Sequence, residues 1–221
     1  MSRPRRSLLA FPFLLLLALL LAGCTTTRRP PSEYLSLQGI DKRPEPGDFE
    51  VCASAGCRKS DRLAYSEAEW SALRSLFQPA PDSPAEERAR IALAVALTEE
   101  YVGQKNGTRL DRPMNRREGL HEGQLDCIAE ATNTTVALLL FEREGLLRHH
   151  RVGFPVHRGF LQLKLPHNTA TLFETSTGAH FAVDSWFLEN GREPVIVPVS
   201  AWKTDYSPFE PNPWHEPLPK P

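Results

Sequence analysis

The hydrophobic pattern of the chain changes at Gly145, and this change limits the folds that the chain can adopt. Before Gly145, apolar residues recur at helical spacing in three segments, 67–77, 84–102 and 126–144. After Gly145, apolar and polar residues alternate in short segments separated by Gly, Asn and Pro, which is typical of strands. We expect these strands in LLRHHRVGFPV, FLQLKL, HNTATLFE, HFAVDSWF and EPVIVPVSAW. Helices followed by strands predict an α+β domain in which the helices pack on an antiparallel β-sheet.

Local signals mark the ends of the helices. Ser66 and Ser83 are each followed three residues later by Glu, the pattern of a capping box, and Pro84 occupies the first position of the second helix. Gly145 is expected to cap the third helix at its C-terminus. Residues 103–123 contain Gly, Asn-Gly and Pro, so they predict a long connection before that helix.

The N-terminal segment has the layout of a secretory signal. Arginines near Met1 precede an apolar run from Leu8 to Leu21, and small residues lead to Cys24. The ending Leu-Ala-Gly-Cys resembles the lipobox of bacterial lipoproteins, which implies cleavage before Cys24 and acyl chains, diacylglycerol and a fatty acid such as palmitate, on the new terminus. An uncleaved transmembrane anchor is the alternative, although the run is shorter than the ~20 residues that a span needs.

The same resemblance places the mature protein at the outer membrane, facing the periplasm, because Thr25 rather than Asp follows the cysteine. Several acyl chains would anchor it stably in the membrane. We expect a signal peptide over 1–23, a lipidated tether rich in Pro, Thr and charge over 24–48, one domain over 49–205 and a Pro-rich tail over 206–221. The 26 basic and 27 acidic residues nearly cancel, so the charge gives no reason to expect a nucleic-acid partner.

The remaining cysteines divide into a pair and a single thiol. Cys52 and Cys57 lie in FEVCASAGCRKSDRLAYS, which predicts a strand, a turn and a return strand. A disulfide across that turn suits the oxidising periplasm. The alternative, half of a metal site, requires two further ligands that the sequence does not offer at a recognisable spacing, so we predict neither a metal nor another cofactor.

Cys127 is left without an obvious partner, in the first turn of the third predicted helix. There the helix dipole and the unpaired amides favour a thiolate over a thiol. The alternative is an inert cysteine that fills the core as a small apolar residue.

A reactive thiol needs a base and a group that orients the base. The segment HNTATLFETSTGAHFAVDSWF predicts a hairpin that turns near Gly178. If Thr175 pairs with Gly178, His167 and Asp184 lie on one face as diagonal neighbours within reach of each other. A three-residue turn would put them on opposite faces. The other histidines have simpler explanations as solvated, turn or helix-end residues, and they are His149, His150, His157 and His180.

The motifs DCIAEATNTTVALLLFEREGLL, HNTATLF and FAVDSW resemble the core of the transglutaminase-like, papain-like superfamily, including its bacterial cysteine peptidase branch. The resemblance covers about residues 84–200 and implies a papain-like core with the nucleophile at the N-terminus of a central helix. It implies Cys127 as the nucleophile, His167 as the base and Asp184 as the acid that orients the base.

The residues before Cys127 depart from the family pattern. Many members have an aromatic residue or a Gly-Val/Trp-Cys sequence there, whereas this chain has Gln124-Leu-Asp-Cys127. Gln124 and the amide of Cys127 are candidate oxyanion donors, although Gln124 could also be an ordinary residue ahead of the helix. Trp186 and Trp202 could line a cleft or belong to the core.

These features favour an envelope lipoprotein whose Cys-His-Asp site acts on amide bonds as a peptidase, an amidase or an acyltransferase. Attack by the thiolate and proton transfer from the histidine would serve hydrolysis and transfer alike, and the substrate would be an envelope protein or a peptidoglycan peptide. A noncatalytic outer-membrane lipoprotein that uses the same fold for binding or envelope organisation is the alternative, since a fold does not determine an activity.

Overall fold

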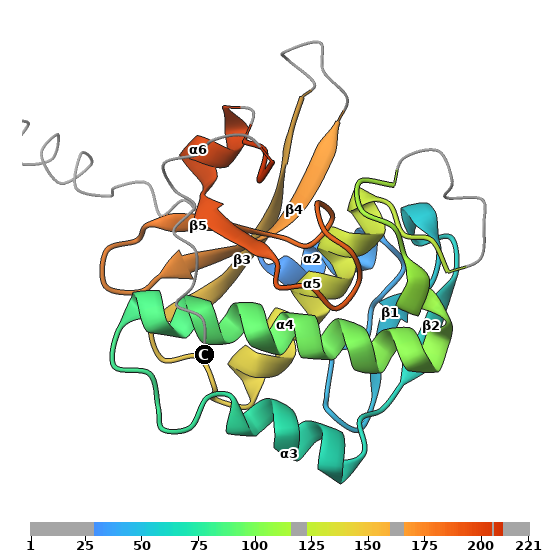
Figure 1. Ribbon diagram of the computed structural model, residues 1–221, viewed down its shortest axis with the longest axis horizontal. Helices are drawn as coiled ribbons and strands as arrows, with labels where there is room; N and C mark the ends of the chain where they lie inside the picture. The colour runs from blue at the N-terminus through green and yellow to red at the C-terminus, as the bar shows by residue number, and fades with distance from the viewer. Residues whose placement is uncertain (1–28, 116–122, 160–165, 205, 210–221) are drawn as a thin grey trace, which may run out of the picture.

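The computed structural model describes residues 29–115, 123–159, 166–204 and 206–209, and Figure 1 shows their arrangement. The protein has a mixed α and β fold with helices and antiparallel sheets, as the sequence predicts. Within these ranges, no helix is both long enough and apolar enough to cross a membrane. Cys24, the predicted signal peptide and most of the Pro-rich tail lie outside them.

An N-terminal helix, α2 (Pro31–Leu37), packs on the domain. Tyr34 and Leu35 of this helix, and Ile40 after it, are buried in the main core. Burial of three large apolar side chains is enough to hold so short a segment in place. The extended tether expected over 24–48 is therefore wrong for its described part, and the domain begins before residue 49.

Strands β1 (Phe49–Cys52) and β2 (Ser60–Leu63) form a two-stranded antiparallel sheet. The turn between them contains a short 3-10 helix, η1 (Ala55–Cys57). A disulfide joins Cys52 to Cys57 across this turn, with the two Cα atoms 4.7 Å apart. The strand, turn and return strand predicted around the cysteine pair are thus present, together with the disulfide.

Three longer helices follow in the predicted order, and they are α3 (Glu67–Ser75), α4 (Pro84–Asn106) and α5 (Cys127–Arg143). Ser66 caps α3 by accepting a hydrogen bond from the amide of Glu69 at 3.2 Å. Ser83 caps α4 in the same way, accepting from the amide of Glu86 at 3.1 Å. Both predicted helix starts are therefore confirmed.

Helix α4 continues to Asn106, beyond the end predicted at residue 102. Gly103 lies inside the helix, at a point where the backbone of Arg109 approaches closely. A Cβ at residue 103 would lie 2.8 Å from that backbone, so the close packing requires a glycine. The C-terminal cap is Gly107, whose φ of 84° is left-handed. The connection that follows begins with a second 3-10 helix, η2 (Thr108–Leu110).

A four-stranded sheet with the order β3-β4-β5-β6 forms the second half of the domain. Its strands are β3 (His150–Arg158), β4 (His167–Glu174), β5 (His180–Asp184) and β6 (Val195–Pro198), and each pairs antiparallel with the next. Ala170 pairs with Val183, the register that follows from opposing Thr175 to Gly178. The condition placed on the predicted hairpin is therefore met.

The last predicted strand ends earlier than expected. Strand β6 stops at Pro198, and helix α6 (Val199–Lys203) begins at the next residue, so VSAW is helical rather than extended. A proline lacks the amide hydrogen that a strand needs to continue its ladder, whereas its φ suits the start of a helix. The predicted strand FLQLKL lies outside the described residues.

Helix α5 forms the centre of the molecule (Figure 1). It contacts β3 and β4 of the large sheet, β1 and η1 of the disulfide turn, and helices α2 and α4. Most of its residues are buried, which explains the apolar run that follows Cys127. A second cluster of buried side chains joins the end of β5 to β6 and α6, and Cys127 packs at the edge of this cluster.

Candidate functional site

Cys127 is the first residue of α5 and is partly exposed. The preceding residue, Asp126, caps the helix: its Oδ1 accepts hydrogen bonds from the amides of Ile128 at 3.2 Å and Ala129 at 3.0 Å. A third amide, that of Gly56 in the disulfide turn, donates to the same oxygen at 2.8 Å. Among the hydrogen bonds of the described residues, none uses the amide of Cys127. The thiol thus lies at the positive end of the helix dipole, beside an amide that makes none of the described hydrogen bonds.

His167 and Asp184 meet where β4 begins and β5 ends. Nε2 of the imidazole lies 2.6 Å from Oδ2 of the carboxylate, and the two side chains are 2% and 1% exposed. The carboxylate also accepts hydrogen bonds from the indole Nε1 of Trp202 at 2.7 Å and from the amide of Trp186 at 3.3 Å. Because an ionised carboxylate can only accept, the proton of neutral His167 lies on Nε2, and Nδ1 carries the lone pair.

The Nδ1 atom of His167 is buried and has no hydrogen-bond partner among the described residues. The thiol of Cys127 is close enough to act on this imidazole, although the two atoms do not meet the geometry of a hydrogen bond. Burial alone would lower the pKa of His167, but the charge and hydrogen bond of Asp184, with a smaller contribution from Cys127, raise it above its ordinary value. The structure thus brings the three residues Cys127, His167 and Asp184 together.

Three aromatic rings surround the imidazole of His167. The ring centroids of Trp186, Phe187 and Trp202 lie 4.4, 5.3 and 5.3 Å from the imidazole centroid. All three side chains are buried in the second core cluster. The two tryptophans are therefore core residues that also border the site, and they keep water away from the pair of His167 and Asp184, which strengthens its electrostatic interaction.

Asn168 contacts the sulfur, and sequence reasoning did not identify it. Its Nδ2 donates to Sγ of Cys127 at 3.8 Å, while the thiol lies 3.9 Å from the carbonyl oxygen of Pro166. Neighbouring side chains of a strand point to opposite faces, so a search for residues that share a face with His167 passes over the next residue in the chain. The sulfur lies beside the start of β4, where three consecutive residues reach it.

Gln124, the predicted oxyanion candidate, lies in the connection before α5. Its Nε2 donates to the carbonyl oxygen of Leu110 at 2.9 Å, and its Oε1 accepts from Nδ2 of Asn115 at 3.0 Å. The side chain is buried and holds the loop that contains these two partners. These contacts correspond to the ordinary structural alternative for Gln124, and they give its oxyanion role no support.

Among the described hydrogen bonds, none joins Cys127 to any of the other candidate histidines. His149 and His150 bind the buried carboxylate of Glu87 beyond the C-terminal end of α5, His149 through its amide at 3.0 Å and His150 through Nδ1 at 2.9 Å. His180 stacks on a phenylalanine near the hairpin turn, and His157 is exposed on β3. His149 and His150 follow the end of α5, as predicted, but His157 lies in β3 rather than in a turn, and His180 lies partly buried in β5 rather than solvated.

Three buried carboxyl groups lie beside the first turn of α5, and sequence reasoning did not identify them. Burial raises the pKa of Glu99 to about 7 and that of Asp111 to about 6, and it raises the pKa of Glu130 well above its ordinary value. Asp111 accepts a hydrogen bond from the amide of Leu125 at 2.7 Å, and Glu99 accepts from the amide of Gly191 at 3.0 Å. The cluster thereby fixes the loops before α5 and after β5. One available signal was an acidic residue, Glu130, inside the apolar run of a central helix.

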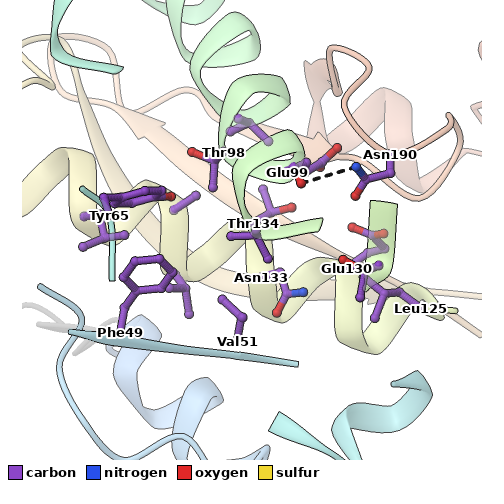
Figure 2. Close-up of a pocket in the computed structure, with 16 residues that line it drawn as sticks. Phe49, Val51, Tyr65, Thr98, Glu99, Leu125, Glu130, Asn133, Thr134 and Asn190 are labelled. Carbon is purple, nitrogen blue, oxygen red and sulfur yellow. Dashed lines mark hydrogen bonds between the residues drawn. The ribbon is translucent and has the colours of Figure 1, made fainter. Parts of the chain in front are cut away.

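A small cavity adjoins this carboxyl cluster (Figure 2). Glu99, Glu130, Tyr65 and Thr98 are among its lining residues, and the side chain of Asn190 closes one side by donating to the carbonyl oxygen of Glu99 at 3.3 Å. The free volume of about 20 Å³ has room for one or two water molecules and none for a substrate. Across the described ranges, no group of three His, Cys, Asp or Glu side chains is arranged to hold a metal ion.

No protein-family model matches the chain, and neither do any of the curated proteins or solved structures compared with it. The resemblance to the transglutaminase-like superfamily therefore stays a prediction.

Proposed function

We propose that the protein is a thiol-dependent enzyme that acts on amide bonds, with Cys127 as the nucleophile, His167 as the base and Asp184 as the acid that orients the base. One observation carries the proposal. The buried imidazole of His167 donates through Nε2 to Asp184, which leaves Nδ1 unprotonated and unpaired among the described residues beside the thiol of Cys127. A cysteine kept only for packing has no need of a buried, oriented base next to its sulfur.

In this mechanism, Nδ1 of His167 takes the proton of Cys127, and Asp184 stabilises the resulting imidazolium. The thiolate attacks the carbonyl carbon of an amide, and a carbon–sulfur bond forms as the carbonyl π electrons move to oxygen. His167 then gives its proton to the leaving amine as the carbon–nitrogen bond breaks. The acyl-enzyme transfers its acyl group to water or to a second amine, and the thiol is restored.

The negative charge on the carbonyl oxygen requires hydrogen-bond donors. We assign this role to the amide of Cys127 and to the side-chain amide of Asn168. The first belongs to the start of α5 and is open among the described hydrogen bonds, and the second already donates to the sulfur at 3.8 Å. Gln124 is the weaker candidate, because its side-chain amide donates to Leu110.

The resemblance to the transglutaminase-like, papain-like superfamily supports the same assignment. Helix α5 begins at Cys127 and is central, while His167 and Asp184 come from adjacent antiparallel strands, β4 and β5. We therefore infer a papain-like core. A lipoprotein anchored through Cys24 in the outer membrane, facing the periplasm, would act on an envelope protein or on peptidoglycan peptides.

The reactivity of the thiol tests the proposal. The full chain, purified in detergent, is treated with iodoacetamide across a range of pH, and the modified cysteine is identified by mass spectrometry. We expect Cys127 to react faster than free cysteine at neutral pH, and we expect His167→Ala to abolish this advantage. Equal rates for Cys127 and free cysteine, unchanged by the substitution, would favour the noncatalytic alternative.

A further inference from the structure

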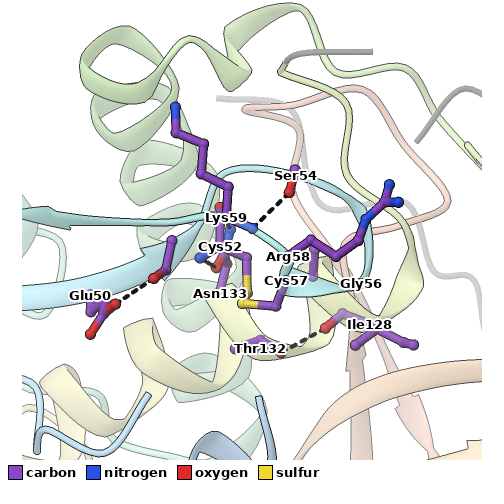
Figure 3. Close-up of a disulfide and its surroundings, with 12 residues drawn as sticks. Glu50, Cys52, Ser54, Gly56, Cys57, Arg58, Lys59, Ile128, Thr132 and Asn133 are labelled. Atoms are coloured by element: carbon purple, nitrogen blue, oxygen red, sulfur yellow. Dashed lines mark hydrogen bonds between the residues drawn. A yellow bond between two sulfur atoms is a disulfide. The ribbon is translucent and has the colours of Figure 1, made fainter. Parts of the chain in front are cut away.

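The disulfide turn contacts the helix of the proposed nucleophile at two points. At the first, the amide of Gly56 donates to Oδ1 of Asp126, the residue that precedes Cys127. At the second, the side chain of Asn133 accepts from the amide of Cys52 at 2.7 Å and donates to the carbonyl oxygen of the same residue at 3.0 Å (Figure 3). The turn thus lies along the first two turns of α5.

The backbone of this turn is held in an uncommon conformation. Gly56 and Cys57 both have positive φ values, 62° and 51°, and Cys57 is one of two non-glycine residues with positive φ in the described chain. A residue with a side chain is disfavoured in this region and stays there only when its surroundings impose it. Here the disulfide ties Cys57 to the end of β1. Without that bond, the hydrogen bond from the amide of Cys57 to the carbonyl oxygen of Ser54, at 3.1 Å, is the only described one that holds Cys57 within the turn, so Cys57 can leave the left-handed region more easily and take the neighbouring Gly56 amide with it.

Loss of the Gly56 amide would change the surroundings of the thiol. Oδ1 of Asp126 accepts three amides, and two of them, from Ile128 and Ala129, belong to α5 itself. The Gly56 amide is the donor that comes from outside the helix. Without it, the negative charge of Asp126 is less compensated, and a nearby negative charge disfavours a thiolate at Cys127. The start of the helix, and with it the position of Sγ against His167, is also less firmly fixed.

We propose that the Cys52–Cys57 disulfide is a redox control of the thiol site: the oxidised turn positions Asp126 and keeps Cys127 reactive, and reduction of the turn lowers that reactivity. In the controlling step a dithiol reduces the disulfide. Two electrons and two protons pass to Cys52 and Cys57, which become thiols, and the dithiol becomes a cyclic disulfide. Cys127 takes no part in this exchange. The inference rests on the proposed function, because it concerns the reactivity of the same thiol.

The test compares the full chain with the double variant Cys52→Ser/Cys57→Ser in the same detergent. The rate of alkylation of Cys127 is measured as a function of pH for each, with the modified residue identified by mass spectrometry. We expect the rate at neutral pH to fall about tenfold in the double variant, the factor that corresponds to one pK unit, and the midpoint of the pH profile to move upward. Wild-type protein that has been reduced by a dithiol, and then freed of it, should match the double variant.

A control in the same turn distinguishes loss of the contact between Gly56 and Asp126 from a general loosening of the turn. Ser54→Ala removes the hydrogen bond that the Ser54 hydroxyl accepts from the amide of Lys59 at 2.9 Å, and it leaves both cysteines and Gly56 in place. We expect this variant to alkylate at the wild-type rate. Thermal unfolding of all the variants shows whether the fold is retained.

Two results would overturn the inference. The first is a folded double variant whose Cys127 reacts as fast as in the wild type. The second needs no variant: hydrogen exchange of the oxidised wild-type protein should show a protected Gly56 amide, and free exchange there would remove the contact on which the control depends. Failure of the proposed function gives a different result, since Cys127 of the wild type would then react no faster than free cysteine.

Discussion

The imidazole of His167 and the carboxylate of Asp184 come from adjacent strands and meet in a hydrogen bond of 2.6 Å that is almost closed to solvent. Asp184 is held in turn by the indole of Trp202 at 2.7 Å. The carboxylate is therefore fixed on both sides of Oδ2, and it dictates which nitrogen of His167 carries the proton. This relationship sets the expectations for the site.

Asp184→Asn should inactivate the thiol although it hardly changes the shape of the side chain. Because the indole of Trp202 donates to the same oxygen as Nε2 of His167, the amide oxygen of the asparagine takes that position, and the neutral amide no longer stabilises the imidazolium that forms when His167 takes the proton of Cys127. We expect a loss of roughly 10²- to 10⁴-fold in turnover of an amide substrate, the usual contribution of a positioned base. The measurement combines alkylation rates of Cys127 with nitrogen NMR of the imidazole. Trp202→Phe, which leaves the carboxylate in place, should cost much less.

The raised pKa of His167 predicts a dependence of stability on pH. A group that binds its proton more tightly in the folded state stabilises the fold fully below its unfolded pKa, about 6.5 for histidine. That contribution is lost as the pH rises through the higher folded pKa. The free energy of unfolding of the wild type, measured in urea, should therefore fall over this window relative to that of His167→Gln. A difference between the two proteins that stays constant with pH would contradict the prediction.

The carboxyl cluster predicts a dependence of stability on pH with the same sign, over a range that begins at a lower pH. Glu99 and Asp111 have folded pKa values of about 7 and about 6, so their neutral forms are favoured in the fold, and stability should decline as the pH rises from about 4.5 to above 7. Glu130→Gln removes one of the mutually repelling groups. We expect it to raise the free energy of unfolding at pH 8 by roughly 1–3 kcal/mol and to flatten the decline. Glu50→Gln, a substitution of a carboxylate outside the cluster, serves as the control.

Asn168→Ala should slow alkylation of Cys127 and turnover together. The carboxamide donates to the sulfur at 3.8 Å, and loss of one hydrogen bond to a charged group costs about tenfold or more in rate. Asn168→Asp should be more harmful than the alanine variant, because it adds a negative charge beside the thiolate. If both variants alkylate at the wild-type rate, the contact has no bearing on the reactivity of the thiol.

Leu35→Ala tests whether the N-terminal helix belongs to the domain. Leu35 is 2% exposed, and truncation of a buried leucine costs about 2–5 kcal/mol in the free energy of unfolding. Leu37 lies in the same helix but is 65% exposed, so Leu37→Ala should change that free energy by less than about 0.5 kcal/mol. Equally small effects of the two substitutions would indicate that this segment is a tether and not part of the folded domain.

Much of the architecture follows from local signals. Ser66 and Ser83 predict their helices because capping depends on residues a few positions apart. The register of the hairpin depends on the length of one turn, and once this is set, His167 and Asp184 share a face. The start of α5 is equally local, since Asp126 accepts from the amides just after it.

The missed features depend on contacts between distant segments. Composition marks residues 24–48 as a tether, and only packing against α5 and β3 makes Tyr34 and Leu35 buried. In the sequence alone, Gly103 predicts the end of a helix. The close approach of Arg109, which explains a glycine inside the helix, cannot be inferred from neighbouring residues. The contact of Asn168 with Cys127 likewise depends on where α5 begins relative to β4.

The position of α2 has a consequence for where the protein can work. Only six residues, 25–30, separate the proposed lipid-bearing Cys24 from the first turn of α2, and even a fully extended chain of that length reaches about 25 Å at most. Because α2 packs against α5, the helix that begins at Cys127, the end of the chain that carries the proposed anchor and the thiol belong to the same region of the domain. An enzyme tethered by so short a segment would stay close to the bilayer. Its substrates would then be amide bonds in molecules that are themselves bound to or inserted in the membrane.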